Sequence, residues 1–215
     1  MVNAKKIYSQ LLSNARILEI VPEENIFNSY PSLISQFPCI IFLDENQNDV
    51  APGEVGELAV KGEGVMLCYY KNPEATAEVL KDGWLYTGDM AREDEDGFIY
   101  LVDRKKDVVI SGGENLYPVQ IEDFMRGFDK IKDVAVIGLP HPRLGEIAAA
   151  IVEIKEGESC TEEEINTFCM GMPRYKRPKK IIFDQIPRNP TGKIEKPVLR
   201  EKYCQGRLVE TQITG

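Results

Sequence analysis

The sequence predicts an α+β fold built from short elements. Two observations carry this prediction: stretches with helical periodicity alternate with short apolar runs, and turns containing Gly or Pro separate them. The chain has 215 residues, of which 43% are hydrophobic and 28% charged, as in a globular protein and unlike a disordered one. This length corresponds to one or two domains and suffices for a buried core.

The first hundred residues are expected to be rich in strands. Residues 5–18 have the spacing of a short helix, and three prolines then interrupt the chain up to Pro38. A second short helix is expected from Asn72 to the turn-forming pair Asp82-Gly83. Strands are expected at residues 39–43, 57–61, 84–91 and 98–103. The last two strands flank an acidic turn that ends in glycine, which indicates a hairpin.

The second half of the chain predicts helices packed on a sheet. Four apolar residues share one helical face at spacings i, i+3, i+4 and i+7: Ile121, Phe124, Met125 and Phe128. Another helix begins at Thr161, because Thr161 and Glu164 form a capping box. A final helix is expected from about Glu195. Strands are expected at residues 108–110, 134–139, 148–154 and 180–183.

Residues 103–107 (DRKKD) are all charged. Five consecutive charges do not fit easily inside one core. We therefore expect this run to connect two domains.

The net charge of −9 excludes a protein that binds DNA through overall electrostatic attraction. Residues 173–202 nevertheless hold ten basic and three acidic residues, a local charge of +7 that leaves −16 for the rest. This basic segment indicates either a local anionic ligand or a solvated basic face. It contains only two aromatic residues, Tyr175 and Phe183, which argues against nucleic-acid binding.

Histidine and cysteine usage excludes several kinds of site. The only histidine, His141, lies between two prolines in a stiff loop and is expected to be either structural or on the surface. The five cysteines are widely spaced without a C-x-x-C pair, so we expect no metal site and reduced thiols in a cytoplasmic protein. The longest uncharged run, residues 25–43, is too polar to span a membrane.

Three glycine-containing motifs could carry chemistry. Residues 86–89 (YTGD) place the Asp89 carboxylate, which can accept both hydroxyls of a ribose, after a glycine that allows close approach. Residues 111–115 (SGGEN) place two glycines where a thin substrate can pass the backbone. Lys193 follows a glycine in a loop, which suits one charge aimed at a developing anion. This loop is no phosphate-binding P-loop, because Pro187 and Ile194 replace the required glycine and hydroxyl residue.

Several motifs of this chain, taken in order, resemble the C-terminal signatures of adenylate-forming enzymes. They are YTGD, DRKKD, SGGEN with the following residues 116–118 and 121–122, and residues 190–193 (PTGK). The acyl-CoA synthetase branch is the best match. The resemblance covers about residues 49–203 and includes residues 53–58 (GEVGEL).

This resemblance implies a ligase that forms an acyl-adenylate from a carboxylic acid and ATP, and then transfers the acyl group to coenzyme A. It implies these roles: Lys193 as the catalytic residue; Asp89, Arg104, Tyr86 and Thr87 at the nucleotide; Lys106 as a hinge; and Gly112, Gly113, Tyr175, Arg177 and Lys179 at coenzyme A. Lys193 would contact the acid and the α-phosphate.

Members of this family are more than twice as long, and their large N-terminal domain carries the phosphate loop, the acyl pocket and the Mg²⁺ ligand. The resemblance therefore implies the end of a large domain at residues 39–103, a hinge at 103–107 and a small lid domain at 108–215, with helices on a mainly antiparallel sheet. Residues 1–38 stay unassigned. We expect either an incomplete synthetase whose chemistry needs the large domain, or a lid module that binds coenzyme A or AMP and acts in trans with a separate one.

Overall fold

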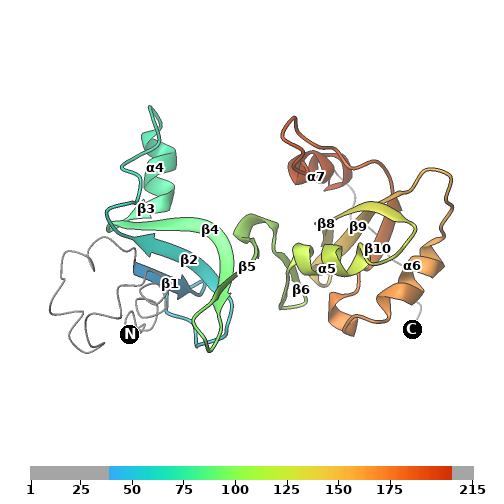
Figure 1. Cartoon of the computed structure of the whole chain (residues 1–215), viewed down its shortest axis with the longest axis horizontal. Helices are drawn as coiled ribbons and strands as arrows, with labels where there is room; N and C mark the ends of the chain where they lie inside the picture. Colours follow the sequence, from blue (N-terminus) through green and yellow to red (C-terminus); the bar gives the residue numbers. More distant parts are fainter. Residues whose placement is uncertain (1–38, 205–215) are drawn as a thin grey trace, which may run out of the picture. The chain divides into compact units, whose positions relative to one another are not determined.

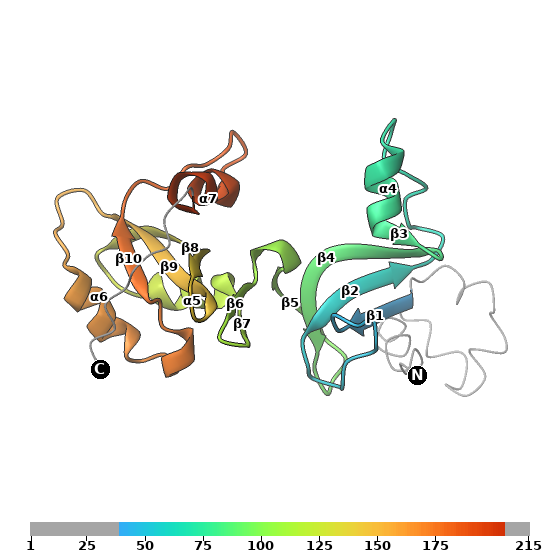
Figure 2. The same cartoon turned by 180° about the vertical axis from the view of Figure 1, so that it is seen from behind.

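A computed structural model describes residues 39–204 (Figures 1 and 2). The chain divides between Lys105 and Lys106 into two compact units, each with its own five-stranded sheet. The predicted helix at residues 5–18 and the unassigned segment 1–38 lie outside the described residues. The predicted α+β class is confirmed.

The first unit is a curved antiparallel sheet. Its strands are β1 (Cys39–Leu43), β2 (Gly56–Lys61), β3 (Leu80–Lys81), β4 (Trp84–Glu93) and β5 (Ile99–Arg104), in the order β1-β2-β4-β3 with β5 also paired to β4. Register shifts between Glu57 and Ala59 and between Met90 and Ala91 interrupt the pairing, and β4 bends along its length (Figure 1). Bulges of this kind increase the local bend and twist of a strand.

Helix α4 (Pro73–Val79) is shorter than predicted. It begins as expected, because the Asn72 side chain accepts a hydrogen bond from the Ala75 N–H and Pro73 occupies the first turn. The prediction that Asp82-Gly83 ends the helix is wrong. Both residues have positive φ, 51° and 79°, as in a type I′ turn, and they join β3 to β4.

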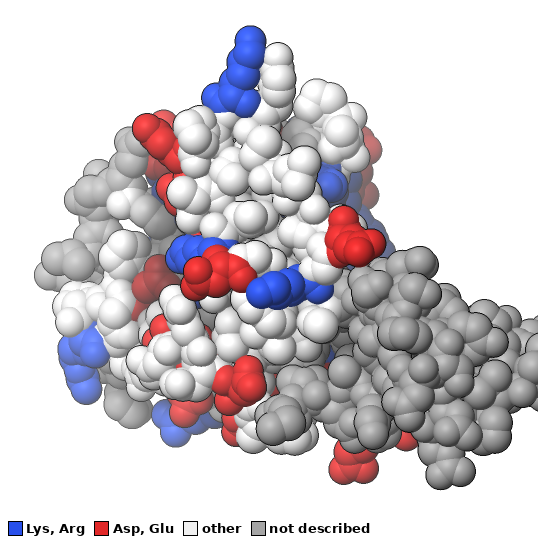
Figure 3. All heavy atoms as spheres, turned by 90° about the vertical axis from the view of Figure 1, so that its left-hand side faces the viewer, with Lys and Arg blue, Asp and Glu red and all other residues white. Residues whose placement is uncertain are grey.

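The core of the first unit is small. Within residues 39–105, the buried hydrophobic residues are Phe42, Leu43, Ala59, Ala91 and Val102. Seen from one side, the described part of this unit presents mostly uncharged atoms, with charges of both signs scattered among them (Figure 3).

The second unit combines a mainly antiparallel sheet with three helices. Its strands are β6 (Val109–Ser111), β7 (Glu114–Leu116), β8 (Ile131–His141), β9 (Gly145–Ile154) and β10 (Lys180–Phe183). Their order is β10-β9-β6-β7, with β8 also paired to β9, and only the β9–β10 pair is parallel. The helices are α5 (Pro118–Met125), α6 (Glu162–Cys169) and α7 (Lys196–Cys204), with a 3₁₀ turn at Arg174–Lys176. A second 3₁₀ turn, Lys105–Asp107, spans the boundary between the two units.

Both faces of the β8–β9 hairpin are covered. Alternate residues of a strand point to opposite faces. Val134 and Val136 belong to a core shared with α5 and α6, whereas Ala135 and Ile137 belong to a second core with Leu199 of α7. This burial on both sides explains why β8 and β9 are nearly continuous runs of apolar residues.

Three local predictions for this unit need correction. The two glycines of SGGEN form the turn of a hairpin that joins β6 to β7. The sequence predicts a loop at the residues that form β7. Phe128 lies beyond the end of α5, although its ring still packs 5.1 Å from that of Phe168. β8 extends through His141, which is buried, and its Nδ1 accepts the Leu144 N–H. The expected loop and surface position of His141 are therefore wrong, because His141 is a buried strand residue.

Candidate functional site

Asp89 and Arg104 face each other on neighbouring strands. They are register partners in the β4–β5 pair, and Arg104 Nη1 lies 2.7 Å from Asp89 Oδ1. The Thr87 hydroxyl donates to the Leu58 carbonyl and accepts the Asp89 N–H, so Thr87 holds the backbone before the carboxylate. Gly88 has φ +70°, and a Cβ atom there would meet open space. The arrangement offers a charge-balanced, partly exposed carboxylate beside open backbone, which can accept hydrogen bonds from a diol.

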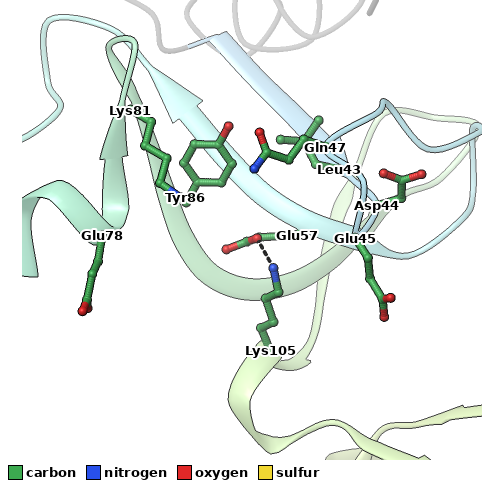
Figure 4. A pocket seen from close by; sticks show the side chains of 9 residues that line it. All are labelled: Leu43, Asp44, Glu45, Gln47, Glu57, Glu78, Lys81, Tyr86 and Lys105. Carbon is green, nitrogen blue, oxygen red and sulfur yellow. Dashed lines mark hydrogen bonds and ion pairs between the residues drawn. The ribbon is translucent and has the colours of Figure 1, made fainter.

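Tyr86 lines a different part of the same unit. It borders a hollow of ≈ 160 Å³ whose nine lining residues are Leu43, Asp44, Glu45, Gln47, Glu57, Glu78, Lys81, Tyr86 and Lys105 (Figure 4). Lys81 Nζ lies 5.4 Å from the centre of the Tyr86 ring. Asp89 and Arg104 do not line this hollow. The structure therefore brings Asp89, Arg104 and Thr87 together and leaves Tyr86 outside that group.

Lys106 lies between two anchored neighbours. Lys105 Nζ contacts Glu57 Oε2 at 2.7 Å within the first unit (Figure 4), and Asp107 Oδ1 contacts Arg200 Nη2 at 2.6 Å within the second. Lys106 is exposed. The five charges of residues 103–107 do not share one core: Arg104, Lys105 and Lys106 are exposed, and the two aspartates lie in different units. Asp103 and Asp107 are buried, 8% and 9% exposed, because hydrogen-bond or ion-pair partners accompany them.

The loop that carries Lys193 is closed by hydrogen bonds. Arg188 and Ile194 form an isolated β-bridge, and the Asn189 N–H donates to the Lys193 carbonyl. The Asn189 side-chain oxygen accepts the N–H groups of Thr191 and Lys193 and the Thr191 hydroxyl. Gly192 has φ +84°, as the turn requires. The Lys193 side chain is exposed and makes no ion pair with the described residues.

The predicted coenzyme A residues lie in two separate places in the second unit. Gly112 and Gly113, with φ 61° and 89°, form the exposed β6–β7 turn, where the Gly112 N–H donates to the Leu144 carbonyl. Tyr175 and Lys179 are exposed. Arg177 is already engaged, because its guanidinium donates to the carbonyls of Met170 and Met172.

Four of the ten basic residues of segment 173–202 form ion pairs with described residues, three of them with acidic residues elsewhere in the second unit. The ion pairs are Arg188–Asp133, Lys196–Glu122, Arg200–Asp107 and Lys202–Asp184. Within the described residues, four basic side chains of the segment make no ion pair or hydrogen bond: Arg174, Lys179, Lys180 and Lys193. The partners Asp133, Glu122 and Asp107 could not be identified from the sequence, because they lie far away along the chain, whereas Asp184 lies within the segment itself.

Two kinds of feature are absent from residues 39–204. No helix in this range is both long and apolar enough to cross a membrane. No group of three or more His, Cys, Asp or Glu side chains in the same range could hold a metal ion.

Comparisons with known proteins extend the resemblance. Residues 120–193 match the family described as the AMP-binding enzyme C-terminal domain. The long-chain-fatty-acid–CoA ligase FadD13 of Mycobacterium tuberculosis is 49% identical over 150 residues, which are 69% of this chain and 30% of that protein. A feruloyl-CoA synthase of Amycolatopsis sp. is 44% identical over 156 residues, 72% of this chain and 32% of that protein.

The fold is shared as well. The crystal structure of ATP-bound MatB from Rhodopseudomonas palustris matches with a TM-score of 0.72 and 36% identity, over 78% of this chain and 34% of that one. Residues 120–193 therefore carry the AMP-binding enzyme C-terminal domain, and the predicted resemblance to adenylate-forming enzymes of the acyl-CoA synthetase branch is confirmed. The chain spans about a third of the length of the curated relatives that it matches.

Proposed function

We propose that this chain is the C-terminal part of an ATP-dependent acyl-CoA synthetase. The whole enzyme would convert a carboxylic acid, ATP and coenzyme A into acyl-CoA, AMP and pyrophosphate. The observation that carries this proposal is the Asp89–Arg104 pair beside open Gly88, within the stretch shared with CoA ligases. Because the chain spans a third of those ligases, its chemistry requires the rest of the enzyme.

In the first half-reaction, an oxygen of the substrate carboxylate attacks the α-phosphorus of ATP, and the bond to pyrophosphate breaks. Asp89 accepts hydrogen bonds from the ribose hydroxyls, assisted by Arg104, while Thr87 holds the backbone before Asp89 and Tyr86 meets the nucleotide from outside this group. The Lys193 ammonium contacts the acid and the α-phosphate, where negative charge develops. Mg²⁺, held by the large domain, would supply charge neutralisation on the phosphates.

In the second half-reaction, the thiolate of coenzyme A attacks the acyl carbonyl and AMP leaves. The Gly112-Gly113 turn borders the path of the pantetheine arm, and Tyr175, Arg177 and Lys179 meet the nucleotide end. Lys106 is the hinge about which the second unit rotates between the two half-reactions. The anchored positions of Lys105 and Asp107 support this assignment.

A second arrangement is a lid module that binds coenzyme A or AMP in the cytoplasm and works in trans with a separate large domain. The two-sided core of the second unit favours it, because such a core supports independent folding. Calorimetry of the 215-residue chain with coenzyme A and with AMP tests this alternative, and absence of heat for both ligands contradicts it. Robust ATP–pyrophosphate exchange by the isolated chain contradicts the proposal of an incomplete enzyme.

The main test fuses this chain, from residue 39, to the large part of FadD13 that precedes the matched region. We expect ATP–pyrophosphate exchange with long-chain fatty acids, followed by acyl-CoA formation. Lys193→Ala should slow the exchange by roughly 10²–10³-fold. The matched control is Lys155→Ala, because Lys155 is also exposed and has no ion pair with the described residues. A folded, active fusion in which Lys193→Ala exchanges at the unchanged rate would contradict the role of Lys193.

A further inference from the structure

The loop that carries Lys193 is held at its first end by a charged bridge. The guanidinium of Arg188 donates to the Gly192 carbonyl within the loop and to the carboxylate of Asp133. Asp133 lies on β8, the longest strand of the second unit, and is only 9% exposed. Arg188 therefore ties the residue immediately before Lys193 to the rigid sheet.

The other end of the loop is held by a nearly buried ion pair. Lys196, at the start of α7, places its Nζ 2.8 Å from Oε1 of Glu122 on α5. Glu122 is 4% exposed, and the same oxygen accepts the Val136 N–H of β8 at 2.8 Å. Both ends of the segment 188–196 are thus fixed to elements outside it.

One arginine connects the two anchors. Arg126 Nη2 lies 3.7 Å from Glu122 Oε2, and its Nε lies 4.0 Å from Asp133 Oδ1. Between the anchors, the Asn189 side chain accepts the Lys193 N–H at 2.9 Å. The backbone around Lys193 is therefore held at both ends of its loop, while the Lys193 side chain is left exposed.

We propose that Arg188, bridged to Asp133, is a positioning residue for Lys193 in the adenylation step. This inference rests on the proposed function, in which Lys193 acts only in the first half-reaction. A lysine is flexible, so its contribution depends on a backbone that holds it at the right distance from the reacting atoms. Loosening the bridge should impair adenylation and spare thioester formation.

The first test uses the 215-residue chain and needs no activity. Amide hydrogen exchange, read on peptides that cover residues 186–195, should be about tenfold faster in Arg188→Gln. Asp133→Asn should have a similar effect, and the double variant should show less than the sum of the two, because both changes break the same bridge. Peptides from α6 should exchange at the unchanged rate, which shows that the unit stays folded.

Arg188 is chosen over Lys196 because its side chain is 45% exposed, whereas that of Lys196 is 11% exposed, and because the Asp133 carboxylate that it leaves behind keeps Arg126 Nε at 4.0 Å. Arg174→Gln is the matched control, since Arg174 is exposed and without a partner in the part of the chain described. Unchanged exchange in Arg188→Gln, as in this control, would overturn the proposal.

The second test measures the two half-reactions separately in the FadD13 fusion. Arg188→Gln should slow ATP–pyrophosphate exchange about ten- to hundredfold. It should leave the conversion of pre-formed acyl-adenylate to acyl-CoA unchanged, whereas general loss of structure would slow both. Arg188→Lys should recover only part of the rate, because an ammonium cannot reproduce the two-sided bridge.

The outcomes separate this inference from the proposed function. If Lys193→Ala leaves the exchange rate unchanged, the role assigned to Lys193 fails. If Lys193→Ala slows exchange but Arg188→Gln does not, only the positioning role of Arg188 is overturned.

Discussion

At the scale of single residues, Gly56 shows how closely β1 and β2 approach. A Cβ atom at Gly56 would lie 2.7 Å from the Leu43 nitrogen and 2.9 Å from the Phe42 carbonyl carbon. These are backbone atoms, so one strand would have to shift. We expect Gly56→Ala to destabilise the first unit by roughly 1–3 kcal/mol in urea denaturation followed by fluorescence.

Gly64 is the matched control for this substitution. A Cβ atom there meets nothing within 4 Å, and its φ is not positive. Gly64→Ala should change the free energy of unfolding by less than about 0.5 kcal/mol. Equal stability of the two variants would mean that the β1–β2 approach is looser than described.

Single residues also show what the sequence can reveal about a site. Asp89 and Lys193 were identified because motifs place a carboxylate and an ammonium next to glycines. Arg177 also lies in a motif that is rich in basic residues, yet its guanidinium donates to the carbonyls of Met170 and Met172. A sequence gives the residue type at a position, whereas the partner of a long side chain depends on chain segments that fold against it.

At the scale of elements, the start of α6 is determined locally. The Thr161 side chain accepts the Glu164 N–H, and the Glu164 side chain accepts the Thr161 N–H. Thr161→Ala removes half of this capping box and should cost about 1 kcal/mol of stability, measured by urea denaturation followed by circular dichroism. Thr167→Ala, at an exposed site within the same helix, serves as control and should cost nothing measurable. A cost at Thr161 no larger than at Thr167 would contradict the capping role.

The docking of α7 depends on Asp184, which follows β10. Hydrogen bonds from Lys202, and then from Tyr203, lower the pKa of Asp184 below its ordinary value of 3.8. A lowered pKa means that the folded state favours the ionised carboxylate. The stabilisation is therefore complete above pH 3.8 and is lost as pH falls through the lower pKa of the folded state.

We accordingly expect Asp184→Asn to flatten the acid limb of the stability profile. The thermal midpoint, measured between about pH 5 and pH 2, should fall less steeply than in the unmodified chain. Asp129→Asn should keep the original slope, because Asp129 is exposed and makes no ion pair within the described residues. Parallel profiles for the unmodified chain and Asp184→Asn would contradict this role.

Elements were predictable where the local pattern was strong. The capping box located α6, and the apolar runs located β8, β9 and β10. The pattern failed where tertiary pairing decides the outcome: β7 has only three residues and exists because it pairs with β6. Leu80 continues the apolar helical spacing, yet it pairs with Leu85 of β4 and so ends α4.

At the scale of the whole molecule, charge is organised by pairing between distant segments. The uneven distribution of acidic and basic residues was visible in the sequence. The ion pairs that result from this distribution were not visible, since the acids that pair with the basic segment come from α5, β8 and the ends of other elements. What the basic segment leaves exposed is therefore a few separate cations, among them Lys193.

The two units differ most in the size of their cores. Within residues 39–204, five buried hydrophobic residues belong to the first unit and 22 to the second. Burial of apolar surface is the main source of folding free energy. We therefore expect the first unit to unfold at a lower urea concentration than the second.

The only tryptophan makes this prediction easy to measure. Trp84 lies on β4, so its fluorescence reports the first unit alone. Three of the four described α-helices, α5, α6 and α7, lie in the second unit, so circular dichroism at 222 nm mainly reports that unit. The fluorescence transition should come first. Coincident curves would mean that the units unfold together.

If the large domain covers the first unit in the complete enzyme, the fusion with FadD13 should shift a fluorescence transition of Trp84 to higher urea and leave the dichroism transition of the second unit nearly unchanged.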